Sequence, residues 1–205
     1  VPVFVHMSTE AVLADGSPVR MASHEAPPTS RPAGRYSATK GAAEGIVMTA
    51  SGLGRVVVLR PRFVWGAGDT NVLPALVAAA RAGSLLWIGG GRYLTSTTHV
   101  RNLVAAIRLV AEDERAHGVY PVTDGEPRPF REMVSAMLAT QGVDAPTRTT
   151  PHWAATAMAR GSEALWAVLR RPGKPPLTRQ ELALIGQEMT LDDSRIREEL
   201  GFRDA

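Results

Sequence analysis

Short apolar runs alternate with longer segments of helical periodicity along most of this sequence. Residues 3–7 and 55–59 are apolar runs of strand length, and a polar loop and a helical pattern at 36–50 lie between them. A strand, a loop, a helix and a second strand in this order are typical of a right-handed crossover between parallel strands. The pattern therefore predicts an α/β fold with a parallel sheet.

The remaining chain continues this alternation. Helices are predicted at 72–82, 100–112, 130–141, 153–169, 180–187 and 194–200, a third strand at 119–122, and a small hairpin over 85–94 around three glycines. Residues 15–35 predict a loop and residues 172–176 a rigid linker. The longest apolar candidate, residues 73–80, is too short to cross a bilayer, so no transmembrane segment is predicted.

Composition narrows the function classes. Of the 205 residues 44% are hydrophobic and none is cysteine, which excludes disulfides and thiolate metal sites and predicts a cytoplasmic protein. The five histidines lack metal-ligand spacing, so no metal site is predicted. The net charge of +3 comes from scattered basic residues without a clustered stripe, and no nucleic-acid partner is predicted.

The candidate chemistry centres on Tyr36 and Lys40. They are four residues apart in a predicted helix and therefore share one face. The positive charge of a lysine ammonium lowers the pKa of a neighbouring tyrosine hydroxyl. Such a tyrosine can exchange a proton with a substrate oxygen near neutral pH. With so few tyrosines and lysines in the chain, this spacing arises by chance with a probability of about 3%. An incidental pair on a solvated helix face is the alternative.

Other polar segments follow the predicted strands. Ligands of open parallel sheets bind outside the carboxyl ends of the strands. Thr9, the loop at 60–69 and the segment after Val122 all fall at that edge. We therefore expect one site that combines these segments with Tyr36 and Lys40.

Five motifs occur in a fixed order along nearly the whole chain. They are Val-Phe-Val-His-Met-Ser-Thr at 3–9, Tyr-Ser-Ala-Thr-Lys at 36–40, Leu-Arg-Pro-Arg-Phe-Val-Trp-Gly-Ala-Gly-Asp at 59–69, Thr-His-Val-Arg-Asn-Leu at 98–103 and Leu-Gly-Phe at 200–202. Together they resemble the extended short-chain dehydrogenase/reductase family, which includes NAD-dependent epimerases and dehydratases and 3β-hydroxysteroid dehydrogenases. Trp65, Ala67 and Arg101 depart from the family's usual tyrosine, proline and aspartate, which affects fine substrate contacts and not the fold.

The resemblance implies the C-terminal half of a Rossmann-type doubly wound parallel sheet with a small, mostly helical substrate-binding lobe. Residues 1–69 and 99–123 would form part of the NAD(P)-binding core, and residues 70–98 and 124–205 the lobe. The family's Gly-x-x-Gly-x-x-Gly turn and its first strand–helix units, about a hundred residues at usual lengths, are missing. Because the sequence also opens directly in a strand, we expect a fragment.

The resemblance also implies residue roles. Tyr36 would be the general acid/base, and Lys40 would support it and bind the nicotinamide ribose of NAD or NADP. Thr9 would hydrogen-bond the reacting oxygen, and Pro61 and Val64 would line the nicotinamide pocket. From the residues alone, Thr9 is equally consistent with a cap or turn residue.

The implied function is NAD(P)-dependent oxidation or reduction of a small-molecule substrate. Apolar residues at 73–77 and 85–88 favour a hydroxyl or carbonyl of a hydrophobic alcohol, as in 3β-hydroxysteroid dehydrogenases. A nucleotide-sugar epimerase or dehydratase, or a non-catalytic remnant or binding module of the same fold, is the alternative. Without a pyrophosphate cradle, the 205 residues alone are expected to be inactive, and a homodimer is expected only at full length.

The helix predicted at 153–169 and the residues that follow it combine apolar and basic side chains. They are Trp153, Leu165, Trp166 and Leu169 with Arg160, Arg170, Arg171 and Lys174. Such a helix can lie on a membrane surface. The favoured interpretation is a helix that caps the substrate pocket.

Overall fold

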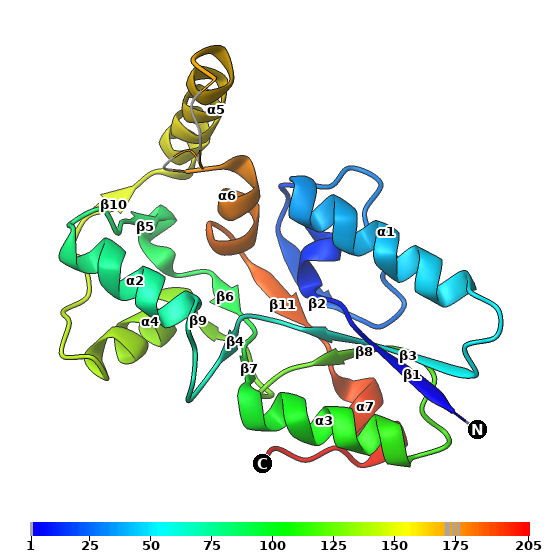
Figure 1. Ribbon diagram of the computed structural model, residues 1–205. Helices are drawn as coiled ribbons and strands as arrows, with labels where there is room; N and C mark the ends of the chain where they lie inside the picture. The colour runs from blue at the N-terminus through cyan, green and yellow to red at the C-terminus, as the bar shows by residue number, and fades with distance from the viewer. Residues whose placement is uncertain (1, 171–172, 174, 176) are drawn as a thin grey trace.

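A computed structural model describes residues 2–170, 173, 175 and 177–205 (Figure 1). Its centre is a parallel sheet of three strands in the order β1-β3-β8, formed by Val3–Met7, Arg55–Pro61 and Gly118–Val122. Helix α1 (Arg35–Thr49) covers one face of this sheet, and α3 (Val100–Glu112) and α7 (Ser194–Leu200) cover the other (Figure 1). The predicted α/β fold with a Rossmann-type parallel sheet is confirmed.

The core of this unit lies between the sheet and the α3–α7 layer. Its buried members include Val57, Leu59, Tyr120, Ile196 and Phe202. Strands covered on both faces carry continuous apolar runs, which explains the pattern of β3. Helix α7 ends at Gly201, whose φ of +71° is readily adopted by glycine.

Strand β1 is an edge strand of the described sheet. It pairs with β3, with Met7 beside Leu59, and Phe4 on β1 remains 39% exposed. The carboxyl ends of β1 and β3 therefore lie next to each other, with the edge of β1 open beside them.

A second sheet corrects the predicted loop at residues 15–35. Its order is β2-β11-β6-β9, formed by Val19–Ala22, Met189–Leu191, Leu94–Thr95 and Arg128–Pro129. The predicted loop at 15–35 thus contains strand β2, and the 3₁₀ helix η1 (Glu10–Leu13) lies just before it.

The predicted hairpin over 85–94 is wrong. Strand β5 (Trp87–Ile88) pairs in parallel with β10 (Thr149–Thr150), whereas β6 pairs with β11 and β9. The glycines between β5 and β6 form the short 3₁₀ turn η2 (Gly89–Gly91) with positive φ angles, which directs the two strands into different sheets. A further short pair joins β4 (Val64–Trp65) to β7 (Thr98–His99).

The remaining helices lie on the other side of the second sheet or above it. Helices α2 (Val72–Arg81) and α4 (Phe130–Ala139) pack around a cluster that contains Trp87 and Phe130. Helix α5 (His152–Val168) stands away from the body and contacts α6 (Arg179–Ile185) at its base (Figure 1). The predicted linker at 172–176 lies mostly outside the described residues. Within the described part of the chain, no helix is long and apolar enough to cross a membrane.

Candidate active site

Tyr36 and Lys40 lie in the first turns of α1, at the carboxyl end of β1. The Lys40 ammonium donates to the backbone carbonyl of Met7 at 2.9 Å, which leaves two of its N–H groups without a partner among the described residues. The Tyr36 hydroxyl makes no hydrogen bond with the described part of the protein, and its side chain is among the exposed ones. The Tyr36 backbone N–H donates to Gln180 Oε1 at 2.9 Å, which attaches the start of α1 to α6. The pair therefore presents one free hydroxyl and a fixed ammonium.

Thr9 begins the 3₁₀ helix η1 directly after β1. Its hydroxyl accepts a hydrogen bond from the Ala11 N–H at 3.3 Å and donates to Glu10 Oε2 at 2.6 Å. Thr9 is thus the N-cap of η1, and it is 7% exposed. In this arrangement its hydroxyl proton is directed to Glu10, so Thr9 can accept one further hydrogen bond but cannot donate one.

Glu10 also forms an ion pair with Arg62, which follows the end of β3. Arg62 Nη1 lies 2.8 Å from Glu10 Oε1, and Arg62 Nη2 donates to the carbonyl of Leu184 at 2.6 Å. Both charged side chains are almost fully buried, which requires such pairing. The pair therefore fixes Thr9 relative to β3 and to the end of α6. Sequence reasoning missed it, although an arginine directly after a buried strand indicates an acidic partner.

A second buried network joins α1 to the same two strands. Ser8 Oγ donates to Glu44 Oε2 at 2.6 Å, and Arg60 Nε donates to the same oxygen at 3.2 Å. Arg60 Nη2 also pairs with Glu44 Oε1, and Arg60 Nη1 donates to the Ala26 carbonyl at 2.7 Å. Glu44 lies one helical turn beyond Lys40, so this network holds the helix that carries Tyr36 and Lys40 on the sheet. Sequence reasoning gave Glu44 and Arg60 no role, although an arginine within an apolar strand was a usable signal.

Pro61 and Val64 lie where the chain leaves β3. Pro61 is buried as the last residue of β3, beside Val122 of β8, and Val64 pairs with Thr98. The register of β1 and β3 places Pro61 next to the segment that begins at Thr9. The carboxyl ends of β1 and β3 therefore place Lys40 beside Met7 and Pro61 beside the segment that begins at Thr9, whereas Val64 lies further along the chain, beside Thr98.

Asp124, just after β8, organises the neighbouring loops. Its carboxylate accepts hydrogen bonds from Trp65 Nε1 at 2.8 Å, Thr97 Oγ1 at 2.7 Å, the His99 N–H at 2.6 Å and Asn102 Nδ2 at 2.7 Å. Burial raises the pKa of Asp124, but these hydrogen bonds outweigh it and leave the pKa below its usual range. Sequence reasoning expected this segment at the strand ends but did not single out Asp124.

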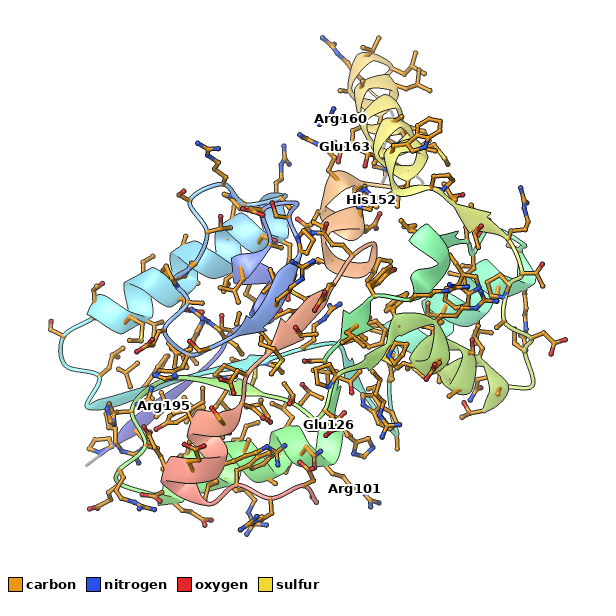
Figure 2. All side chains as sticks on the ribbon, turned by 180° about the vertical axis from the view of Figure 1, so that it is seen from behind. Arg101, Glu126, His152, Arg160, Glu163 and Arg195 are labelled. Atoms are coloured by element: carbon orange, nitrogen blue, oxygen red, sulfur yellow. The ribbon has the colours of Figure 1, made fainter. Side chains whose placement is uncertain are left out.

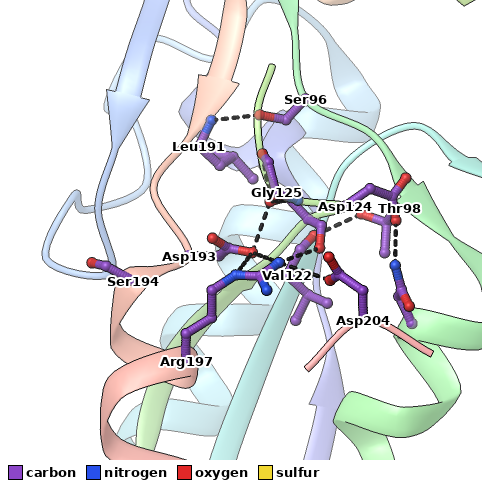
Figure 3. A network of polar contacts seen from close by, with 12 residues as sticks. Ser96, Thr98, Val122, Asp124, Gly125, Leu191, Asp193, Ser194, Arg197 and Asp204 are labelled. Atoms are coloured by element: carbon purple, nitrogen blue, oxygen red, sulfur yellow. Dashed lines mark hydrogen bonds and ion pairs between the residues drawn. The ribbon is translucent and has the colours of Figure 1, made fainter. Parts of the chain in front are cut away.

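A further network joins α7 to the segment that follows β8 (Figure 3). Arg197 pairs with Asp193 and with Asp204, each at 2.9 Å, and Thr123 donates to Asp193 at 2.8 Å. These contacts anchor the C-terminal segment to β8.

A cleft of about 710 Å³ lies beside α1 but does not include the candidate site. Ala38 lines it and lies two residues from Tyr36, which is roughly 200° around the helix. Thr9, Tyr36 and Lys40 do not line it. The cleft therefore borders the flank of α1 opposite to Tyr36 and is not the place where Tyr36 would transfer a proton.

The residues present fit one end of a nicotinamide dinucleotide. The two unpartnered N–H groups of Lys40 can donate to ribose hydroxyls, and the Tyr36 hydroxyl is free on the same helix face. The sequence contains no Gly-x-x-Gly-x-x-Gly turn, so the pyrophosphate has no matching cradle in these residues.

Comparisons with known proteins agree with the fold and the motifs. Residues 1–152 match the 3-beta hydroxysteroid dehydrogenase/isomerase family. Over 199 residues the chain is 45% identical to 4-hydroxy-2-methyl-3-oxo-4-farnesyl-3,4-dihydroquinoline-1-oxide ketoreductase of Stigmatella aurantiaca, covering 97% of this chain and 60% of the relative. It is 29% identical over 208 residues to the decarboxylating sterol-4-alpha-carboxylate 3-dehydrogenase of Dictyostelium discoideum, covering 98% and 63%.

Solved structures show the same fold. The dTDP-glucose 4,6-dehydratase DesIV of Streptomyces venezuelae, with NAD and TYD bound, superposes with a TM-score of 0.65 at 21% identity, covering 99% of this chain and 55% of that chain. The human epimerase family protein SDR39U1, with NADPH, gives 0.67 at 17% identity, covering 99% and 61%. The chain spans less than two thirds of the length of these proteins. The resemblance to extended short-chain dehydrogenases/reductases is confirmed, and the chain belongs to the 3-beta hydroxysteroid dehydrogenase/isomerase family.

Proposed function

We propose that this chain carries the catalytic residues of an NAD(P)-dependent oxidoreductase that acts on a hydroxyl or carbonyl group of a hydrophobic small molecule. The observation that carries the proposal is the free Tyr36 hydroxyl on the same helix face as Lys40, whose ammonium is fixed at the carboxyl end of β1 by Met7. Family membership supports it, since relatives in this family are named as ketoreductases and dehydrogenases.

Tyr36 would move the proton of the reaction. In the reducing direction its hydroxyl proton passes to the carbonyl oxygen of the substrate, and in the oxidising direction the phenolate takes the proton of the substrate hydroxyl. Lys40 would hold the ribose through its two free N–H groups and stabilise the phenolate by its positive charge. When bound, the nicotinamide supplies or accepts the hydride.

Thr9, Pro61 and Val64 would shape the same site. Thr9 can accept a hydrogen bond from a substrate hydroxyl because its own proton is directed to Glu10. Pro61 and Val64 would lie along the nicotinamide at the end of β3. The two buried networks of Glu10 and Glu44 would keep these groups in register.

The substrate class rests on the relatives rather than on the apolar lobe. Leu76, Val77 and Leu85 pack around Trp87 and Phe130 and form the core of the lobe, so they do not identify a ligand. The named substrates of the similar reductases, a farnesyl dihydroquinoline oxide and 2-alkyl-3-oxoalkanoates, are hydrophobic carbonyl compounds. We therefore propose a hydrophobic ketone or the corresponding secondary alcohol.

Location and assembly are part of the proposal. The absence of cysteine supports a cytoplasmic protein. Helix α1 leaves Ile46 and Met48 exposed, which supports a homodimer that packs through α1.

The test is deuterium transfer in the protein at the length at which its gene encodes it. NADH or NADPH deuterated at the reactive carbon is incubated with hydrophobic β-keto compounds, and deuterium in the alcohol is measured by mass spectrometry. We expect transfer by the wild type and by Thr39→Ala, an exposed position on the same helix, and a loss of at least a hundredfold in Tyr36→Phe. Equal transfer by Tyr36→Phe, or none by the wild type, would contradict the proposal.

A further inference from the structure

The cleft beside α1 has two walls that come from distant parts of the chain. Residues 31–35 and the start of α1 form one wall, and α5 and α6 form the other. Its volume of about 710 Å³ lies in the range of sites for small molecules. Because Thr9, Tyr36 and Lys40 do not line it, the cleft is separate from the candidate active site.

Both walls of the cleft carry arginines. Arg31 and Arg35 belong to the first wall, and Arg160 and Arg179 belong to the second. Figure 2 shows Arg160 on the side of α5 that is directed toward the body of the protein. Among the described residues that line the cleft, Asp15 is the one acid. The cleft therefore concentrates positive charge in a concave surface, which attracts anions.

Most of this positive charge has no partner in the described part of the chain. Arg31, Arg35 and Arg160 take part in no ion pair there. Arg179 donates from its backbone N–H and from Nε to Glu163, at 2.8 and 2.7 Å, and its two Nη groups have no partner among the described residues. Glu163 thus fixes Arg179 without occupying the end of its guanidinium. Free guanidinium groups offer paired N–H donors that match the oxygens of a phosphate.

Two helix ends add charge of the same sign. Helix α1 begins after Gly34 and α5 begins at His152, and both residues line the cleft. Neither helix has a side-chain cap at this end. Because the N-terminus of a helix carries partial positive charge, both ends favour an anion in the cleft.

The floor of the cleft is fixed and partly apolar. Gln187 is 7% exposed, and its Nε2 donates to the Ser17 carbonyl at 2.7 Å. Leu182 and Ala183 of α6 lie beside it in the lining. An apolar floor between two basic walls suits a small organic anion, whose carbon part can pack on Leu182.

We propose that this cleft binds a small organic molecule with terminal phosphate groups, which lie between the arginines of the two walls. Because arginines lie on both walls, two phosphate groups should bind much better than one. A terminal phosphate carries close to two negative charges, whereas each phosphate of NADH is internal and carries one, so NADH is a poor ligand here. The proposal does not depend on the proposed oxidoreductase activity.

The test is isothermal titration calorimetry of the protein at its encoded length, at constant ionic strength. The probes are pyrophosphate, in which both phosphates are terminal, and inorganic phosphate. The double variant Arg31→Gln/Arg160→Gln removes one arginine from each wall. Its matched control, Arg101→Gln/Arg108→Gln, removes two exposed arginines from α3.

We expect saturable binding of pyrophosphate by the wild type and by the α3 control, at least tenfold tighter than that of phosphate. The cleft variant should bind pyrophosphate at least tenfold more weakly. Arg31→Lys/Arg160→Lys keeps the charge but not the paired donors, so its loss should be smaller. All four arginines are exposed, and circular dichroism verifies that the variants are folded.

Four results would overturn the proposal. They are no binding of pyrophosphate by the wild type, equal binding by the cleft variant, equal affinity for phosphate and pyrophosphate, and displacement of pyrophosphate by NADH. The last result would assign the anion to the cofactor site.

Discussion

Arg62 and Glu10 form an ion pair with 2.8 Å between Nη1 and Oε1, although they lie 52 residues apart in the sequence. The pair is almost fully buried, and Glu10 at the same time accepts the hydroxyl proton of Thr9. The contact therefore connects the stability of the fold to the orientation of a predicted site residue.

Removing one partner of this pair should be strongly destabilising. Arg62→Met leaves a buried carboxylate without its counter-charge, and we expect a loss of about 3–5 kcal/mol in the free energy of unfolding, measured by urea denaturation. Glu10→Leu/Arg62→Met should lose less than Arg62→Met alone, because no unpaired charge remains. Glu112→Gln breaks an exposed pair with Arg108 and should cost less than about 1 kcal/mol. A double variant less stable than Arg62→Met would refute this account.

Substitutions at Thr9 and at Tyr36 should differ in their effect on the free energy of unfolding. Thr9→Ala removes the N-cap of η1, and we expect a loss of about 0.5–2 kcal/mol in urea denaturation, with Thr9→Ser close to the wild type. Tyr36→Phe removes a hydroxyl that has no partner in the described structure, so its free energy of unfolding should change by less than about 0.5 kcal/mol. A large destabilisation by Tyr36→Phe would show that its hydroxyl has a structural role instead.

His6 should make the fold sensitive to mild acid. Burial and the nearby Lys40 ammonium lower the pKa of His6 below 6.5, against an opposite effect of the Glu44 carboxylate. The unfolded chain then binds a proton more readily than the folded one, so stability is complete above about pH 6.5 and decreases as the pH falls below it, by at most about 1.4 kcal/mol per pH unit.

Thermal unfolding between pH 7.5 and 5.5 tests this effect. The lowered pKa values of Asp69 and Asp124 act at lower pH and do not contribute in this window. We expect His6→Gln to flatten the decrease and His152→Gln, at an exposed site, to retain it. The same slope in wild type and His6→Gln would exclude His6 as its source.

The 205 residues alone should bind nicotinamide dinucleotides poorly. They offer Tyr36 and Lys40 for the nicotinamide end but no Gly-x-x-Gly-x-x-Gly turn for the pyrophosphate. Titration of the isolated chain with NADH and NADPH, followed by the fluorescence of the reduced nicotinamide, should show no saturation in the micromolar range. Saturable micromolar binding would contradict this prediction.

Local periodicity made the main elements predictable. Helix α3 was predicted at its observed bounds because Leu103, Ile107 and Val110 repeat on one face, and β1, β3 and β8 follow from apolar runs. Strands such as β5, β6 and β9 are two residues long and carry no periodicity. Their pairing is decided by distant segments such as β10 and β11, which is why a local hairpin was predicted instead.

The candidate site also contains one feature that was predictable from the sequence and two that were not. The Tyr36–Lys40 pair was accessible from sequence because both residues belong to one helix. The pairs Glu10–Arg62 and Glu44–Arg60 form only when the crossover brings β1, α1 and β3 together. No local sequence pattern indicates which acidic residue pairs with which arginine. The sequence shows Glu10 next to Thr9, but it does not predict that Glu10 accepts a hydrogen bond from the Thr9 hydroxyl.

The most direct test of the central claim is kcat/KM for reduction of a hydrophobic ketone by wild type, Tyr36→Phe, Lys40→Met and the double variant, in the protein at its encoded length. If Tyr36 transfers the proton and Lys40 supports it, each single variant should lower kcat/KM by about 10²–10⁴, and the double variant should be no worse than the weaker single one by more than about tenfold, because the two residues act as a unit. Values of kcat/KM within threefold of the wild type in both single variants would contradict the claim.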